Sequence, residues 1–120
     1  MRYYAKDHEW IEVSGDTGKV GITNHAQAQL GDIVFCEAEP PGTVLPAGGA
    51  AGAVESVKAA ADILSPVSGE ILSVNAGPRD DPSLLNTAPE ETWLFAIRLS
   101  DLSELDALMD GNAYEVFCHE

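Results

Sequence analysis

Lys58 has the position in this sequence that most favours a chemical role. It stands in GAVESVKAAAD (52–62) and is the only lysine or arginine between Lys19 and Arg79. Its small and apolar neighbours alternate in a way that predicts a hairpin with the lysine at or beside the tip. A lysine there projects its amine into water, where an acylating enzyme can reach it. Taken alone, the position also fits an ordinary surface lysine.

Other patterns that could do chemistry are weak. The sequence contains no GxSxG, HExxH or P-loop motif. Its glycine-rich segment at 47–53 leads into a predicted strand, whereas a phosphate-binding loop leads into a helix. The paired carboxylates at 80–81 and 90–91 fall in polar segments, which favours solvated charge over acid–base chemistry.

The cysteine and histidine positions predict neither a disulfide nor a metal site. Cys36 and Cys118 are too few for a disulfide scaffold and form no CxxC, so we interpret them as free thiols of a reducing compartment. His8 and His25 have no second ligand at the spacing of a helix or a zinc finger. His119 lies beside Cys118 in a C-terminal tail that we expect to fray. We therefore predict no structural metal.

Charge limits the kinds of partner. The 120 residues include six basic and twenty acidic ones, which gives a formal net charge of -14. Such a charge repels phosphate backbones and anionic lipids, so we predict no nucleic-acid and no membrane partner. It favours solubility, and it could also steer docking onto basic partner surfaces. The N-terminal residues resemble no targeting segment, which predicts a cytoplasmic protein, or an organellar one whose transit peptide has been removed.

Short β-type runs dominate the chain and predict a mainly β fold, a compact sandwich or flattened barrel in one domain spanning 1–120. Residues 1–31 hold a predicted hairpin and a two-turn helix, residues 32–99 a strand-rich core with the Lys58 hairpin, and residues 100–120 a helical segment. The predicted strands are 9–13, 19–23, 32–39, 53–57, a run after Lys58 that is interrupted at Pro66, 70–74 and 92–99.

Three helical segments are predicted from capping signals. Asn24 is the expected N-cap of a helix that ends at Gly31. The segment RDDPSLLN (79–86) should form one turn with proline at its first position. A C-terminal helix should begin near Asp101, with leucines on one face, and a last turn should point Tyr114 inwards.

The sequence around Lys58 resembles the lipoyl-attachment region of the glycine cleavage system H-protein family. The family motif is ESVKA followed by an aspartate and SPVSGE, and VESVKAAADILSPVSGEI (54–71) follows it closely. The similarity extends in order along the chain, through HEWI, GITNHAQAQLGDIVF, DPSLLN, WLFAIRLSD and AYEVFC. Ordered blocks from residue 3 to residue 118 are far more specific than one short motif.

This resemblance implies a fold and a role. The fold is two small antiparallel sheets in a sandwich, related to lipoyl and biotinyl carriers, with Lys58 on a hairpin. The role is that of a carrier without catalytic activity of its own, with lipoic acid joined to Lys58 as an amide. Glu55 and Asp62 belong to the attachment motif. Glu9 and Asp62 are the acidic positions expected to meet the amine of the loaded arm, and Asp7 replaces a frequent serine.

The resemblance also implies partners. They are a pyridoxal-phosphate glycine decarboxylase, a tetrahydrofolate-dependent aminomethyltransferase, the FAD- and NAD-dependent dihydrolipoamide dehydrogenase, and lipoate-attaching enzymes. The expected function is to carry an aminomethyl group from the first enzyme to the second and electrons to the third.

Several departures from the family pattern keep alternatives open. The loop before the hairpin lacks the usual charged residues, Cys36 replaces a frequent valine, and PEET (89–92) precedes Trp93. These changes affect the surroundings of the arm and the partner-facing loops. A related protein that mainly relays lipoyl groups, or that serves another lipoate-dependent pathway, is one alternative. A biotinyl carrier is disfavoured because methionines normally flank its lysine, and an unmodified binding module is disfavoured by the motif acids.

Overall fold

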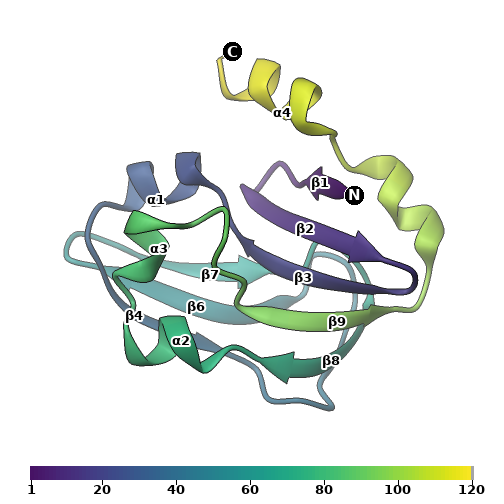
Figure 1. Cartoon of the computed structure of the whole chain (residues 1–120), viewed down its shortest axis with the longest axis horizontal. Coiled ribbons are helices and arrows are strands. Elements are labelled where there is room, and N and C mark those ends of the chain that lie inside the picture. The colour runs from purple at the N-terminus through teal and green to yellow at the C-terminus, as the bar shows by residue number, and fades with distance from the viewer. Residues whose placement is uncertain (120) are drawn as a thin grey trace.

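Two antiparallel sheets form the body of the molecule in the computed structural model, which describes residues 1–119 (Figure 1). The larger sheet has the strand order β1-β2-β3-β9-β8-β5 and the smaller has the order β4-β6-β7. The strands are β1 (Arg2–Tyr4), β2 (Glu9–Ser14), β3 (Thr17–Ile22), β4 (Ile33–Ala38), β5 (Val44–Leu45), β6 (Ala50–Ser56), β7 (Ala60–Leu64), β8 (Gly69–Val74) and β9 (Phe95–Leu99). The predicted fold of two antiparallel sheets is confirmed, and over residues 1–119 they do not close into a barrel.

Apolar side chains from both sheets form one buried cluster. Because side chains of a strand alternate between its faces, each strand contributes its inward residues to this core. Sequestering their apolar surface from water is the main stabilising contribution to the sandwich. Members that are fully buried include Ile11, Val20, Val67, Ile71, Leu85, Phe95 and Ile97.

Most strand predictions are confirmed, with shifted ends. The hairpin of β2 and β3 pairs Glu9 with Ile22 and Ser14 with Thr17. The predicted strand at 53–57 begins earlier, at Ala50, and the one at 92–99 is confined to β9. Strand β1 was not predicted. Its three residues pair with β2, and Tyr4 also forms a bridge to Met109, so tertiary contacts stabilise it.

Helix α1 (Asn24–Leu30) follows the prediction except at its start. The N-cap is Thr23, because its hydroxyl accepts a hydrogen bond from the Ala26 amide, and Asn24 is already helical. The C-terminal end agrees with the prediction. Gly31 has φ of 82°, a left-handed conformation that glycine adopts without the steric cost borne by other residues.

The segment predicted as one helical turn holds parts of two short helices. Helix α2 (Ala76–Asp80) is capped by the Asn75 side chain, and helix α3 is Leu84–Thr87. The prediction of proline at the first helical position was wrong, because Pro82 lies between the helices. The chain there turns through Asp81, whose carboxylate accepts from the Ser83 hydroxyl at 2.5 Å.

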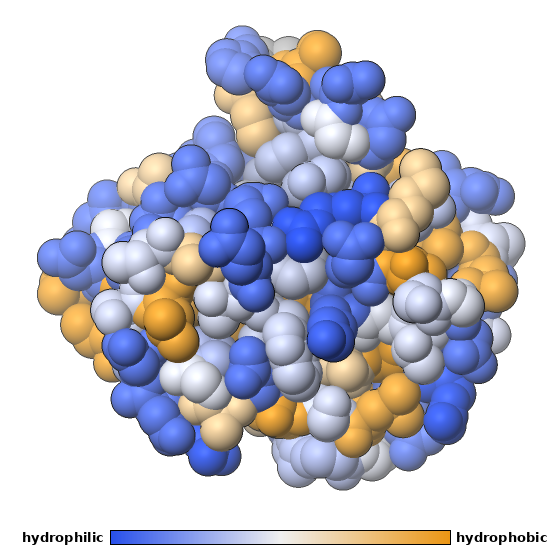
Figure 2. All heavy atoms as spheres, viewed as in Figure 1, coloured by the Kyte–Doolittle hydropathy of each residue, from blue (hydrophilic) through white to orange (hydrophobic). Residues whose placement is uncertain are grey.

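The C-terminal segment is a 3₁₀ helix, η1 (Leu102–Ala107), followed by α4 (Gly111–Cys118), and not one amphipathic helix. Leu105 and Leu108 pack against the core, but Leu102 is 51% exposed, contrary to prediction. Tyr114 points inwards as predicted. Helix α4 stands out from the body as a lobe in the space-filling view (Figure 2). Within residues 1–119, no helix combines the length and apolar character needed to cross a bilayer.

Candidate functional site

Lys58 lies in the turn between β6 and β7, where a few local hydrogen bonds fix the backbone. The Ser56 hydroxyl oxygen accepts from the amides of Lys58 and Ala59 at 3.3 and 3.0 Å. The Ser56 amide donates to the Ala59 carbonyl at 2.7 Å and closes the turn. A serine that bonds to the backbone two and three residues onward is a typical turn former. Lys58 is exposed, so its amine is accessible to an enzyme.

The Lys58 side chain extends over the end of α1. A methyl group placed on Gly31 would lie 3.6 Å from Lys58 Cε. Among residues 1–119, Lys58 forms no salt bridge. The lysine therefore has an accessible amine and a stem directed towards α1.

Asn86 on α3 supports this corner of the molecule, and sequence analysis did not identify it. Its amide nitrogen donates to the carbonyl of Gly31 at 2.8 Å and to Gln27 Oε1 at 2.9 Å. Its amide oxygen accepts from the Ile33 amide at 2.8 Å. One side chain from a distant helix thus holds the connection from α1 to β4 on which the Lys58 stem lies.

A cavity of about 170 Å³ lies between α1, β7 and the turn before β2. Its walls combine apolar side chains with three of the acidic residues selected from the sequence. Leu30, one of its walls, precedes Gly31, the residue towards which the Lys58 stem extends. The lining residues include Asp7, His8, Glu9, Ile22, Leu30, Val54, Asp62 and Ile63.

Glu9 is the buried carboxylate of this cavity, with 4% of its surface exposed. Its Oε2 accepts from the Leu64 amide at 3.3 Å, at the free edge of β7. Its Oε1 is buried without a hydrogen-bond partner among residues 1–119. Burial raises the pKa of the Glu9 carboxyl to about 8, because it disfavours the charged form. Glu9 therefore presents an unsatisfied acceptor to the cavity.

The other predicted residues occupy different places around the hairpin. Asp62 is exposed, so it forms the rim of the cavity and not its floor. Glu55 is also exposed and pairs with Ala60 across the hairpin and with Phe35 on β4. The structure thus brings Glu9, Asp62 and Asp7 to one cavity. Glu55 does not line it and is exposed on the surface of β6.

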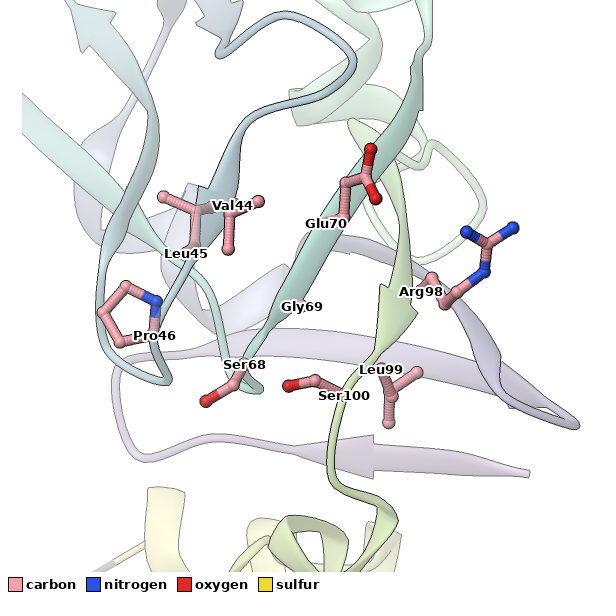
Figure 3. A pocket seen from close by; sticks show the side chains of 9 residues that line it. All are labelled: Val44, Leu45, Pro46, Ser68, Gly69, Glu70, Arg98, Leu99 and Ser100. Atoms are coloured by element: carbon pink, nitrogen blue, oxygen red, sulfur yellow. The ribbon is translucent and has the colours of Figure 1, made fainter.

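The larger groove of about 500 Å³ in Figure 3 lies elsewhere, among β5, β8 and the end of β9. None of its lining residues belongs to the Lys58 hairpin. The labelled Glu70 and Arg98 side chains in Figure 3 point away from the segment 44–46, which forms the other side of the groove. Its size alone does not connect it with the chemistry of Lys58. The residues that line it are Val44, Leu45, Pro46, Ser68, Gly69, Glu70, Arg98, Leu99 and Ser100.

A second group of reactive side chains meets where α4 covers the turn before β2. His8, His25 and Cys118 come from that turn, from α1 and from α4, and one potential ligand atom of each lies within 4.8 Å of the others. Burial, together with neighbouring His25, lowers the pKa of His8. Chain spacing did not indicate this group, because its members are brought together by the packing of α4.

Comparison with known proteins identifies the family. The sequence matches the model described as "Glycine cleavage H-protein" over residues 2–120. The chain belongs to the glycine cleavage H-protein family. The resemblance noted from the attachment motif and its ordered blocks is thereby confirmed.

Similar proteins in this family come from bacteria and a yeast. The glycine cleavage system H protein of Dinoroseobacter shibae is 52% identical over 113 residues, which cover 93% of each chain. The putative glycine cleavage system H protein, mitochondrial, of Schizosaccharomyces pombe is 44% identical, over 99% of this chain and 71% of its own.

A solved structure shares the fold. The crystal structure of a glycine cleavage system H protein from Mycobacterium marinum superimposes with a TM-score of 0.88 at 34% identity, covering 96% of this chain and 94% of that one. Family and fold together support a lipoyl-carrier role in the glycine cleavage system.

Proposed function

We propose that Lys58 carries lipoic acid, bound as an amide to its Nζ, and that the chain is a non-catalytic carrier subunit. The observation that carries this proposal is the exposed Lys58 in a hydrogen-bonded turn, with its stem directed towards the end of α1, a helix that also lines a cavity containing the buried, unsatisfied Glu9 carboxyl. An exposed turn suits an attaching enzyme, and the nearby cavity suits storage of the attached group.

The residues of the cavity fit a lipoyl arm. Leu30, Val54 and Ile63 supply apolar walls for its carbon chain, and Glu9 Oε1 supplies an acceptor for an amine. When bound, the group would supply a strained cyclic disulfide, whose S–S bond can open so that one sulfur holds the aminomethyl carbon and the other becomes a thiol.

The chain's own contribution is to hold and shield that cargo. Glu9 would accept a hydrogen bond from the cargo amine, while its other oxygen stays bonded to the Leu64 amide. Asp62 at the rim would add negative charge at the entrance. Apolar walls exclude water, which matters because a carbon held between nitrogen and sulfur hydrolyses easily.

The proposed partners are those of the glycine cleavage system. The cargo would come from the pyridoxal-phosphate glycine decarboxylase, pass to the tetrahydrofolate-dependent aminomethyltransferase, and leave electrons for dihydrolipoamide dehydrogenase. Val34, Phe35 and Val57 are exposed beside the hairpin tip and offer an apolar contact surface for such enzymes. The proposed compartment is the bacterial cytoplasm, or the mitochondrial matrix after removal of a transit peptide.

Intact mass spectrometry tests the attachment. The purified chain, incubated with lipoate ligase, lipoate and ATP, should gain one lipoyl mass, and peptide mapping should locate it on Lys58. An unmodified mass under conditions that modify another lipoyl domain would contradict the proposal.

Reconstitution separates this function from a lipoyl relay. With glycine decarboxylase, the lipoylated chain should support exchange of glycine carboxyl carbon with bicarbonate. Efficient transfer of lipoyl groups to other proteins, without any such exchange, would instead favour the relay.

A further inference from the structure

His8, His25 and Cys118 have the chemistry and the spacing of a three-ligand metal centre. One nitrogen of each imidazole and the Cys118 sulfur lie within 4.8 Å of one another. In a tetrahedral zinc site, bonds of about 2.0 Å to nitrogen and 2.3 Å to sulfur put neighbouring ligands roughly 3.3 to 3.7 Å apart. Side-chain shifts of roughly 1 Å would therefore complete this geometry, and all three residues are half-buried.

The backbone directs these side chains towards one another. His8 has φ of 71°, a left-handed conformation uncommon in residues other than glycine. Its ring lies against that of His25, with centroids 4.4 Å apart. Cys118 is the last residue of α4, whose N-terminal end is capped by Asp110.

A hydrogen-bonded support lies behind His8. Its Nδ1 is 2.7 Å from Tyr114 Oη, which is 2.7 Å from Thr23 Oγ1. With Nδ1 protonated and donating to Tyr114, Nε2 is available to a metal, and the tyrosine hydroxyl donates in turn to Thr23. Metal-binding histidines usually have their second nitrogen oriented by such a partner.

We propose that His8, His25 and Cys118 bind one Zn²⁺ ion, with a fourth position open to water or a further ligand. Two imidazoles and one thiolate are ligands that zinc accepts, and three protein ligands are typical of sites with an open position. The ion would tie α4 to α1 and to the turn before β2. Since His8 also lines the cavity of Glu9, the ion would lie beside that cavity.

Cobalt substitution tests this site on the untagged full-length chain, because many surface carboxylates could bind zinc without specificity. Titration of the reduced, metal-free protein with Co²⁺ under anaerobic conditions should produce a thiolate-to-cobalt charge-transfer band and tetrahedral d–d bands at one equivalent. Zn²⁺ should displace both sets of bands.

Variants assign the ligands. Cys118→Ser should abolish the charge-transfer band, and His25→Ala should weaken Zn²⁺ binding by at least tenfold. Tyr114→Phe, which removes only the supporting hydroxyl, should weaken it by about tenfold. His119→Ala is the matched control and should bind like the unmodified chain, because the His119 Nδ1 contacts the Glu115 carbonyl of the preceding helical turn. Circular dichroism checks that each variant is folded.

Two results would overturn the proposal. One is an octahedral cobalt spectrum that is identical for the unmodified chain and Cys118→Ser, which would show binding to carboxylates. The other is tight binding of one Zn²⁺ that survives both Cys118→Ser and His25→Ala.

Discussion

The Lys58 turn and the His8–His25–Cys118 group are built in opposite ways. The turn is made of neighbours in sequence, with Ser56 bonding to residues two and three positions onward, and it is exposed. The group joins three distant segments, is half-buried, and depends on α4 packing over the turn before β2. A site of the first kind persists wherever its local sequence does. A site of the second kind exists only when the whole chain is folded.

The largest effect is expected from a substitution of the lysine in the turn. Lys58→Arg should abolish lipoylation completely, since a guanidinium does not form the amide, while the fold is unaffected because the side chain is exposed. Intact mass after treatment with lipoate ligase measures the result. Lys19→Arg is the control and should be lipoylated normally. Any lipoyl adduct on the Lys58→Arg chain would place the attachment site elsewhere.

Cysteine reactivity probes the second kind of site. Cys36 is 3% exposed, and burial raises the pKa of its thiol to about 11, so about one thiol in a thousand is ionised at pH 8. Cys118 is only half-buried and should be alkylated by iodoacetamide at least about 100-fold faster at that pH. Peptide mapping over time measures both rates.

Two conditions test this difference further. The rate of Cys36 alkylation should increase as the pH is raised from 8 towards 11, because the fraction of Cys36 in the thiolate form increases as the pH approaches the pKa. Zinc should slow only the Cys118 reaction if the proposed site exists. Equal rates for the two thiols in the native protein would contradict the packing described for Cys36.

Glu9 connects the two regions through the shared cavity. Glu9→Gln keeps the shape and an acceptor for the Leu64 amide, but removes the carboxylate from the cavity. At pH 9, where a carboxyl with a pKa of about 8 is mostly ionised, loss of the aminomethyl group from loaded protein should be about tenfold faster, given the strength of a hydrogen bond to a charged group. Release of labelled formaldehyde over time measures the rate. Glu70→Gln, on the exposed side of β8, should release at the normal rate. Equal rates for Glu9→Gln and the unmodified chain would exclude this role.

The smallest expected effect concerns the rigidity of the turn. Ser56→Ala removes the hydroxyl that accepts from Lys58 and Ala59, at a cost of about 1 kcal/mol in the free energy of unfolding. The initial rate of lipoylation should fall a few-fold, and denaturant unfolding should show the loss of stability. Ser73→Ala, exposed on β8, serves as control. A lipoylation rate equal to that of the control would mean that the attaching enzyme does not need the preformed turn.

The sequence predicted those elements whose signals lie within a few residues. Strands such as β4 and β8 follow β-type runs, and the α1 end follows from Gly31. Strand β1 escaped prediction because its stability comes from pairing with β2 and Met109. Thr23 and Asn24 are both good caps, and the choice between them became visible only with the backbone geometry at Thr23.

The candidate site divides in the same manner. The attachment motif identified Lys58 and the family. The hairpin was predictable because turn formation and strand alternation depend on near neighbours. Only the tertiary structure placed Glu9 Oε1 in a cavity without a partner, set Asn86 beneath Gly31 and joined His8 and His25 to Cys118. These contacts follow from strand order and from the packing of distant helices, which cannot be read from the spacing of residues along the chain.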